Sequence, residues 1–466
     1  MMEGIVTSIR IGSKSNDCRY NVIWHNKAAQ IRSAVPLDLY DKIDIDDNFE
    51  MPYINAKQPH GRASDAECDA LIASFSKSIG IRQNKPHSIS KEIDRFIEAD
   101  ADAIDSCALI LLEAYVSGAP IIIRFHNDGD GSTGAIALYR AFGYLGKKLF
   151  ENENANAYWT MNKSIAYSED SLFVDESTFN SYKSIRKPLV LLTDFGTTNE
   201  SEGAIKKAYK KYSLVWIDHH PIYDGCPYAD FDFYINPWGL GMNSNICAGV
   251  ITASIAEKLA PGMNFTLLKK AALDSDHSEY YTYNEDTHAL ALVLDSLTAN
   301  DRIGYQEKRI TPKYLDAIIT DPESFARVLN SASAQISESL DIGIKNAKRH
   351  VTKSGIAAYV LDYKAVADRR FEYIKQGRYT TKLQDKLEEI NGFKTITIVY
   401  YKNYISVRVN KGISNSINLL SIIAKLKENT EYVQNGGGHN EAASIKVDYD
   451  ETGSVMHLLL GELIGI

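Results

Sequence analysis

Four short stretches of the sequence combine aspartate with histidine or glycine in a way that suits the binding of a metal ion. The most distinctive is Asp218-His219-His220, which places one carboxylate beside two imidazoles. The other three are His126-Asn-Asp-Gly-Asp-Gly131, Asp194-Phe-Gly196 and Asp274-Ser-Asp-His277. Carboxylates that are crowded into one volume repel one another, and a bound hard cation relieves that repulsion. Each stretch alone is also compatible with an ordinary turn, so the prediction of a metal site depends on all four together.

The chemistry that such a site could perform is hydrolysis of a phosphodiester. Two divalent cations can activate water and clamp the phosphate oxygens during in-line displacement, so no covalent nucleophile is required. Carboxylates and imidazoles suit manganese or magnesium, and the two imidazoles favour manganese. The loop at residues 126–131 is followed by a helical pattern, and the amides at a helix N-terminus also suit a phosphate.

Each of the four stretches follows a run of apolar residues, which predicts the element that positions it. Residues 120–125, 188–193 and 213–217 are short apolar runs typical of buried strands in a parallel sheet. Residues 271–273 are interpreted in the same way, as the end of a strand that leads into Asp274. Helical patterns between the runs have the length expected of crossover connections. Because ligands bind at the carboxyl ends of strands in open α/β sheets, we predict an α/β fold with the four stretches at one edge of a parallel sheet.

In this order the four stretches resemble motifs I to IV of the DHH phosphoesterase superfamily. Near the end of the chain, Asn435-Gly-Gly-Gly-His439 with Ala442-Ala443 is similar to the GGGH signature of DHHA1, the DHH-associated domain of the RecJ-like branch. The resemblance covers residues 115–466. Gly129 departs from it, because alanine is usual at that position in the first motif. His277 and Ser278 also depart from the Thr-Asp-Thr-Gly that is usual in the fourth.

The resemblance implies a fold, a cofactor and a set of ligands. Two divalent ions, manganese by preference and magnesium as the alternative, would be held by six side chains: His126, Asp128, Asp130, Asp194, His219 and Asp276. Asp194 would bridge both ions, and His220 would face the scissile phosphate. Asp218 would either ligate one ion or orient an imidazole, as carboxylates commonly do for metal-bound histidines.

The fourth stretch offers two candidate ligands. Asp276 is preferred because Ser275 supplies the hydroxyl residue that precedes the family's aspartate. Asp274 instead follows directly on Leu273, which is interpreted as a strand residue.

The end of the chain supplies the expected substrate contacts. The glycines of the triplet let backbone amides approach a phosphate closely, although a plain loop is an equal alternative. Arg408, on a predicted strand, is expected to contact a phosphate as the arginine of the corresponding family strand does. The predicted substrate-binding residues are Gly436, Gly437, Gly438, His439 and Arg408.

The apolar patterns, together with the resemblance, predict four regions along the chain. Residues 1–114 are an accessory region, with strands at 4–11, 21–24 and 44–49 and helical spacing at 63–77 and 88–117. The other regions are listed in chain order: a DHH catalytic domain at 115–310, a helical connector at 311–350, and a smaller mixed α/β DHHA1 domain at 351–466 that binds substrate.

Composition restricts the class of protein. With 466 residues and a net charge of -9, the chain is not a passive nucleic-acid coat, which would be basic. The five cysteines show no CxxC spacing, which predicts neither disulfides nor a zinc knuckle and fits a reducing cytoplasm. No apolar run approaches the roughly 18 residues of a membrane span, so we expect a soluble cytoplasmic protein without membrane contacts.

Three functions are compatible with the sequence. The first is a RecJ-like exonuclease on single-stranded DNA or RNA, with roles in DNA repair and replication. The second is a phosphodiesterase for short oligonucleotides or cyclic dinucleotides. The third is a replisome scaffold with little activity, since some relatives in the superfamily keep the fold and lose ligands. For a replisome role, the resemblance implies partners such as the GINS complex. Because every expected ligand type is present here, we favour an active enzyme.

Overall fold

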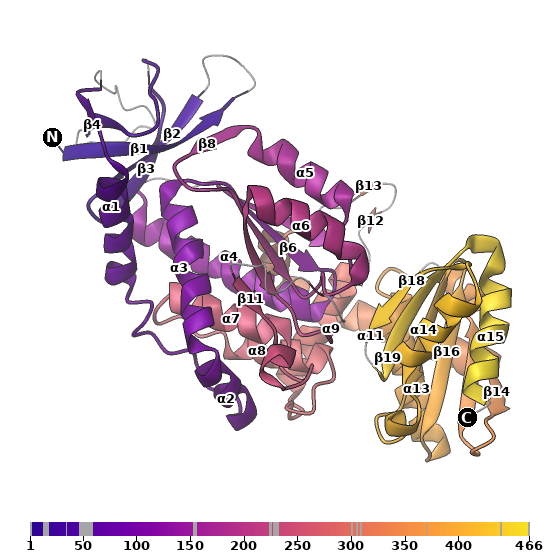
Figure 1. Cartoon of the computed structure of the whole chain (residues 1–466). Helices are drawn as coiled ribbons and strands as arrows, with labels where there is room; N and C mark the ends of the chain where they lie inside the picture. The colour runs from indigo at the N-terminus through magenta and orange to yellow at the C-terminus, as the bar shows by residue number, and fades with distance from the viewer. Residues whose placement is uncertain are drawn as a thin grey trace. The chain divides into compact units, whose positions relative to one another are not determined.

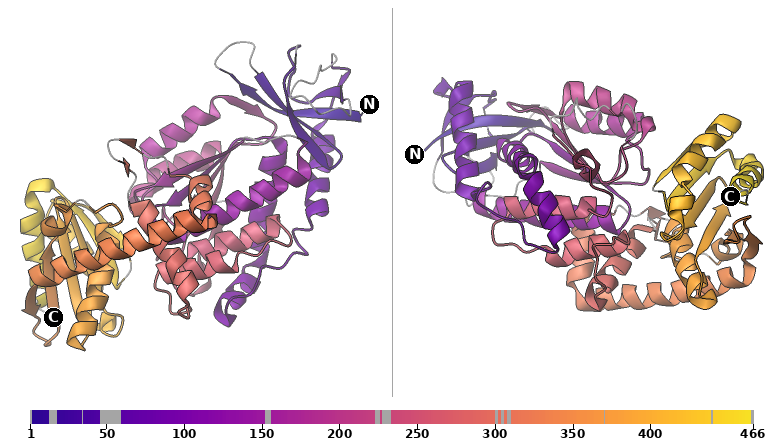
Figure 2. Two further views of the ribbon diagram at one scale, coloured as in Figure 1. Left: turned by 180° about the vertical axis from the view of Figure 1, so that it is seen from behind. Right: turned by 60° about the horizontal axis from the view of Figure 1, so that its bottom comes forward.

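The computed structural model describes residues 2–12, 18–33, 35–45, 59–151, 156–222, 226, 233–299, 302–303, 306–307, 310–369, 371–438 and 440–464. Contacts among its elements divide the chain into two compact units. The first contains Met1–Leu294 and Ile310–Ala317, and the second contains Asp295–Arg309 and Ile318–Ile466. Figure 1 labels the elements, and Figure 2 shows them from two further sides.

The first unit opens with an antiparallel sheet in the order β3-β2-β1-β4-β5, and β8 also pairs with β1. Its strands are β1 (Met2–Ile11), β2 (Cys18–Trp24), β3 (Lys27–Ile31), β4 (Asp41–Ile45), β5 (Gly61–Arg62) and β8 (Tyr182–Ser184). The strands predicted at 4–11 and 21–24 are confirmed. The strand predicted at 44–49 begins earlier, at Asp41, and its residues 46–49 lie outside the described part of the chain.

The helical spacing after this sheet forms α1 (Asp65–Ile79), α2 (Lys91–Ala99) and α3 (Ala101–Ser117). A capping box between Ser64 and Glu67 fixes the start of α1, and Gly80 ends it in the left-handed conformation, with φ +72°. The pattern at 88–117 divides into two helices at Asp100, which leaves helical geometry.

The core of the first unit is a parallel sheet in the order β11-β10-β9-β6-β7. Its strands are β6 (Ile121–His126), β7 (Ala157–Asn162), β9 (Leu189–Thr193), β10 (Ser213–Ile217) and β11 (Phe233–Ile235). The runs predicted as buried strands at 120–125, 188–193 and 213–217 are therefore confirmed. The chain moves outward from β6 to β7 and then returns to the other side of β6 as β9, so a topological switch point lies between β6 and β9.

Helices cover both faces of this sheet. On one face α4 (Gly129–Leu149) packs on β6 and β9, and α7 (Ala248–Leu259) packs on α4 and on β9 and β10. On the other face lie α5 (Glu169–Phe179) and α6 (Glu202–Lys211), which pack against each other (Figure 1). The remaining helices of the region are α8 (Thr266–Ser275), α9 (Glu285–Ala299) and α10 (Pro312–Thr320). A sheet covered on both faces explains why its strands are continuous apolar runs.

One predicted element is wrong. The residues before Asp274 do not form a strand, because 266–275 is the helix α8, which packs on α4 and α7. The interpretation rested on three apolar residues, 271–273, and a run that short does not distinguish a strand from a turn of buried helix.

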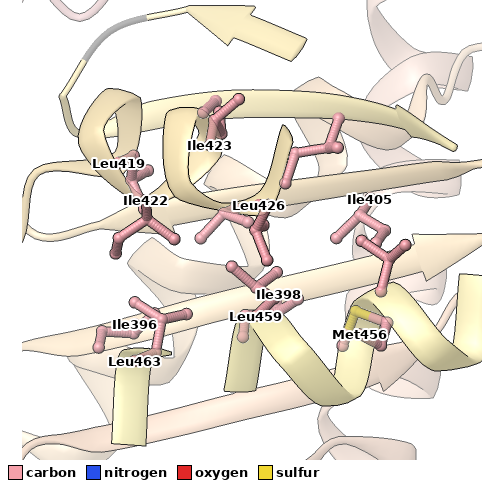
Figure 3. Close-up of a cluster of buried hydrophobic side chains, with 14 of the residues drawn as sticks. Ile396, Ile398, Ile405, Leu419, Ile422, Ile423, Leu426, Met456, Leu459 and Leu463 are labelled. Atoms are coloured by element: carbon pink, nitrogen blue, oxygen red, sulfur yellow. The ribbon is translucent and has the colours of Figure 1, made fainter. Parts of the chain in front are cut away.

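The second unit contains a mixed sheet in the order β14-β15-β16-β17-β19-β18, in which only β15 and β16 are parallel among the described pairs. One face carries a core of isoleucine, valine and leucine side chains under α14 and α15 (Figure 3), and α11 to α13 pack over the other. Its elements are β12 (Arg302–Ile303), β13 (Gln306–Glu307), α11 (Pro322–Asn346), β14 (Lys348–Val351), β15 (Ala357–Asp362), α12 (Lys364–Ala367), α13 (Gln376–Asn391), β16 (Thr395–Tyr401), β17 (Tyr404–Val409), α14 (Leu419–Asn429), β18 (Val433–Gly438), β19 (Ala442–Val447) and α15 (Thr452–Ile464).

The predicted fold class is thus confirmed: a parallel-sheet α/β domain is accompanied by a smaller mixed α/β unit and an N-terminal β-structure. Across the described ranges, none of the helices combines the length and the apolar character needed to cross a bilayer.

Candidate metal centre

The acidic and imidazole side chains gather where the parallel strands end. His126 is the last residue of β6, Asp194 follows β9, and Asp218 follows β10 directly. Asp276 comes from a different element, as the cap at the C-terminal end of α8. The cluster therefore lies at the carboxyl edge of the sheet, beside the switch point between β6 and β9, which is the expected ligand position in this architecture.

One group of ligand atoms is built by the first loop and the end of β9. Nδ1 of His126 lies 2.6 Å from Oδ2 of Asp128 and 3.5 Å from Oδ2 of Asp194. Asp128 also caps α4, because its Oδ1 accepts a hydrogen bond from the amide of Gly131 at 3.0 Å. A side chain at Gly131 would meet the backbone of His126 at 2.6 Å, so the loop can close only with glycine there.

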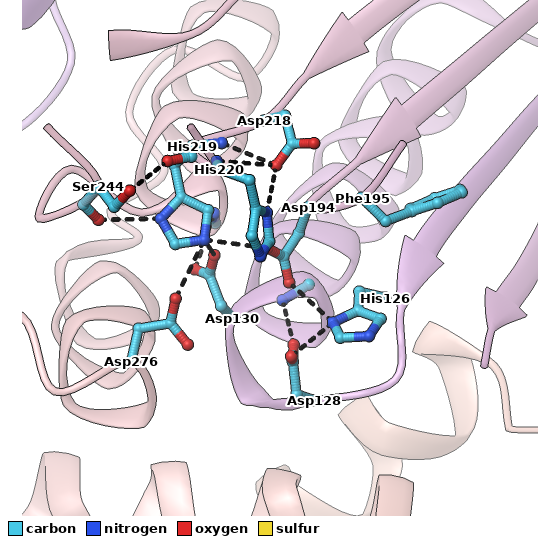
Figure 4. A network of polar contacts seen from close by, with 12 residues as sticks. His126, Asp128, Asp130, Asp194, Phe195, Asp218, His219, His220, Ser244 and Asp276 are labelled. Atoms are coloured by element: carbon cyan, nitrogen blue, oxygen red, sulfur yellow. Dashed lines mark hydrogen bonds and ion pairs between the residues drawn. The ribbon is translucent and has the colours of Figure 1, made fainter. Parts of the chain in front are cut away.

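A second group surrounds the buried ring of His219. Its Nε2 lies 3.2 Å from Oδ1 of Asp194, 3.1 Å from Oδ2 of Asp276 and 3.8 Å from Oδ2 of Asp130 (Figure 4). Its Nδ1 lies 2.9 Å from the carbonyl oxygen of Ser244. A carbonyl can only accept, so this contact places the ring proton on Nδ1 and turns Nε2 towards the carboxylates, the arrangement usual for a metal-bound histidine.

Asp194 lies between the two groups. Its Oδ2 faces His126 and its Oδ1 faces His219 (Figure 4). Its backbone has φ +66°, a left-handed conformation that costs a non-glycine residue of order 1 kcal/mol. The amide of Asp194 donates to the carbonyl of Ile217 at 2.9 Å, which ties the ends of β9 and β10 together and holds the conformation.

Asp130 is fully buried beneath the cluster. Its Oδ1 accepts a hydrogen bond of 2.9 Å from the amide of Gly249, in the first turn of α7. Its Oδ2 and the Oδ2 of Asp194 are buried and have no hydrogen-bond donor among the described residues. Buried carboxylate oxygens without donors are costly, and a cation at this position would satisfy them.

The electrostatics of the cluster also point to a cation. Burial, together with the charges of Asp194 and Asp276, raises the pKa of Asp130 well above its usual range, and burial raises the pKa of Asp194 as well. Burial opposes the charged form of His219, but Asp194 and Asp276 outweigh it and raise the pKa of that ring. Burial likewise opposes the charged ring of His126, yet Asp128 and Asp194 raise its pKa to about 9. The crowded carboxylates thus draw positive charge into the cluster, and divalent ions would supply that charge in place of the ring protons.

Asp218 and His220 form a separate pair at the edge of the cluster. Oδ1 of Asp218 lies 2.7 Å from Nδ1 of His220 and accepts from the amide of His219 at 2.8 Å. Oδ2 accepts from the amide and hydroxyl of Thr197 at 3.2 and 2.5 Å. Burial would raise the pKa of Asp218, but His220, His219 and Thr197 together hold it well below its usual range. With both oxygens engaged, Asp218 fits the role of orienting an imidazole better than that of a ligand.

The structure brings together His126, Asp128, Asp130, Asp194, His219, His220 and Asp276, with Asp218 behind them. It separates the two aspartates of the fourth stretch, because Asp276 contacts His219 whereas Oδ2 of Asp274 lies 2.8 Å from Nδ1 of His288. His220 joins Asp194 and His219 in a group with ligand atoms within 4.8 Å of one another, so its position also suits a ligand.

Two nearby residues were not anticipated. Cys247 lies within 4.8 Å of the ligand atoms of Asp130, His219 and Asp276, and Trp238 donates its Nε1 proton to the carbonyl of His219 at 3.2 Å. Nothing in the spacing of either residue marks it. The nearest signal is the glycine at position 249, two residues after Cys247, whose amide donates to Asp130.

The substrate-binding residues predicted at the end of the chain lie in the second unit. Gly436, Gly437 and Gly438 are part of β18 rather than a loop, and they pair with β19 opposite residues 443–445. The guanidinium of Arg408 donates to Thr381 Oγ1 at 2.8 Å and to the carbonyl of Gly377 at 3.0 Å, which joins β17 to α13. His439 lies outside the described residues. Contact of these residues with a phosphate stays a prediction.

Comparison with known proteins agrees with the motifs. Residues 120–275 match the family model of the DHH family, N-terminal domain. The uncharacterized protein MJ1198 of Methanocaldococcus jannaschii is 26% identical over an alignment of 387 positions that covers 72% of this chain and 50% of that protein. The chain therefore spans half the length of this curated relative.

Two solved structures illustrate the similarity in fold. A DHH domain described as a member of the S1p family of ribosomal proteins has a TM-score of 0.71 at 21% identity, over 86% of this chain and 99% of that chain. RecJ in complex with Mn²⁺ from Thermus thermophilus has a TM-score of 0.48 at 15% identity, over 78% of this chain and 54% of that chain. The first likeness shows a shared fold, and the second is too slight to support any conclusion.

Proposed function

We propose that this chain, whose residues 120–275 match the DHH family model, is a phosphodiesterase that uses two divalent ions, manganese by preference, to hydrolyse single-stranded nucleic acid. The observation that carries the proposal is the arrangement of ligand atoms on both sides of Asp194. His126 and Asp128 lie on one side, and His219 with its carboxylates lies on the other. A carboxylate between two groups of ligands is the arrangement that a pair of ions requires.

The residues fit this cofactor in number and in chemistry. Aspartate oxygens and imidazole nitrogens are the donors that manganese and magnesium accept. When bound, two such ions supply the Lewis acidity that activates water and offsets the charge of the phosphoryl group. His126, Asp128 and Asp194 would hold one ion, and Asp194, Asp130, His219 and Asp276 would hold the other.

The side chain of His220 would act on the substrate itself. Its Nδ1 faces Asp218, and its Nε2 would approach a phosphate oxygen or the leaving group. A donor fixed at that position would stabilise charge that develops in the transition state. Asp218 and Thr197 would keep the ring in place without touching the substrate.

An exposed aromatic ring supports a nucleotide as the substrate. Trp238 is 39% exposed, although its Nε1 is anchored to the carbonyl of His219 and, at 3.0 Å, to Oγ of Ser244. A ring fixed beside the ligands in this way can stack on a base next to the scissile phosphate. An oligonucleotide should therefore quench tryptophan fluorescence more strongly in the native chain than in Trp238→Leu, because Trp24 and Trp216 are buried and the only other tryptophan, Trp159 in β7, is half-buried.

The test is digestion of DNA and RNA oligomers of several lengths, labelled at either end, with manganese or with a chelator. We expect single strands to be shortened from one end in manganese only. Hydrolysis restricted to the shortest oligomers or to cyclic dinucleotides would favour the short-substrate phosphodiesterase. Binding of manganese without any hydrolysis would favour a scaffold, for which replisome proteins would be the partners.

A further inference from the structure

We propose that the thiol of Cys247 is a metal ligand, so that one of the two ion positions has a sulfur donor. This inference rests on the proposed function, because it adds a ligand to the same centre. Cys247 is fully buried and stands immediately before α7, at the cap of that helix.

The geometry places the thiol among recognised donors. Its Sγ, one carboxylate oxygen each from Asp130 and Asp276, and a ring nitrogen of His219 all lie within 4.8 Å of one another. With bonds of about 2.0 to 2.3 Å, two donors on one ion are at most roughly 4.6 Å apart. The four atoms therefore need to move very little to share an ion.

An independent observation indicates that an ion belongs at this position. Oδ2 of Asp130 is completely buried and has no hydrogen-bond donor in the described part of the chain. Its other oxygen is held by the amide of Gly249, two residues after Cys247. The start of α7 thus fixes both the carboxylate and the thiol, and the unsatisfied oxygen faces the volume that the ion would fill.

The other buried cysteines provide a contrast. None of the five cysteines forms a disulfide, and Cys68, Cys107 and Cys226 are also buried. Among the described residues, Cys247 alone of the five belongs to a group of carboxylates and imidazoles. Burial by itself is common for cysteine, so its surroundings distinguish Cys247.

The proposal has a consequence for the choice of metal. Coordination forms a bond between the ion and Sγ, and the thiol proton leaves to solvent. A thiolate is a soft donor, which favours zinc or cobalt over magnesium. The ion position that contains Cys247 would then select against magnesium. The other position, at His126 and Asp128, has harder donors and would accept magnesium.

The experiment is a titration of the metal-free full chain with cobalt(II), followed by absorbance. We expect a thiolate-to-cobalt charge-transfer band in the native chain and in Cys107→Ala, a matched buried control. In Cys247→Ser the band should be lost. The affinity of the affected position for cobalt should also fall by at least roughly tenfold, because even the loss of a residue that only supports a ligand has an effect of that size.

The outcomes separate this inference from the proposed function. Two bound cobalt ions without the band, or a band that survives in Cys247→Ser, would overturn the thiol ligand and leave the metal centre intact. Absence of cobalt binding by the native chain would overturn both. Should Cys247→Ser fail to fold, X-ray absorption of the cobalt-loaded native chain still decides, because a sulfur ligand must appear at about 2.3 Å.

Discussion

The carboxylate of Asp218 holds the ring of His220 at 2.7 Å through Oδ1, while the adjacent ring of His219 is held by the carbonyl of Ser244 instead. Two neighbouring imidazoles are thereby oriented by different partners. His219 directs Nε2 into the carboxylates, and His220 lies at the rim of the cluster, partly exposed. Different roles for the two rings follow from this arrangement.

Replacement of His219 and replacement of His220 by alanine should have different effects. His219→Ala should weaken metal binding, because one imidazole leaves the centre. His220→Ala should keep both ions and lose turnover by roughly a hundredfold or more, as removal of one transition-state donor does. Metal content by elemental analysis and single-turnover hydrolysis would be measured on both variants. If His220→Ala loses metal and His219→Ala keeps it, the two roles are reversed.

The aspartates of the fourth stretch form a second matched pair. Asp276→Asn should abolish activity and lower metal content, because Asp276 lies 3.1 Å from His219 in the cluster. Asp274→Asn should retain both, since Asp274 contacts His288, outside the cluster. The measurement is manganese affinity by calorimetry, with hydrolysis beside it. Equal losses in the two variants would refute the assignment.

Gly249 allows a test of how the helix supports the centre. A Cβ at this position would meet Oδ1 of Asp130 at 2.6 Å and the carbonyl of Asp130 at 2.5 Å. Gly249→Ala should therefore displace Asp130, lowering both manganese affinity and the melting temperature. Gly143→Ala is the control, because it lies in α4 with no atom within 4 Å and should stabilise the chain by about 0.5 to 1 kcal/mol. A Gly249→Ala chain that binds manganese normally would count against the packing described here.

The parts of the centre that the sequence could predict are those that follow a buried strand. Three apolar runs end in His126, Asp194 and Asp218, and a parallel sheet must bring such ends to one edge. The local order of residues is sufficient for that inference. The same local order marks Gly131 as a turn residue, because the loop after β6 must turn tightly.

The parts that the sequence could not predict depend on contacts between distant elements. Cys247 reaches the centre because α7 packs against α4. Asp276 was predicted as a ligand from the resemblance, but the sequence placed it after a strand, whereas it follows the helix α8. A run of three apolar residues does not reveal which element contains it. The glycine triplet was likewise ambiguous, because strand pairing with β19 is set by a partner several residues further on.

The most direct test of the central claim is single-turnover hydrolysis of a labelled single strand in manganese, compared between the native chain and Asp194→Ala. Asp194 faces both His126 and His219, so its loss should release or displace both ions and abolish hydrolysis. Asp274→Asn is the control and should hydrolyse normally. Near-normal turnover by Asp194→Ala in manganese would contradict a centre of two ions that share this carboxylate.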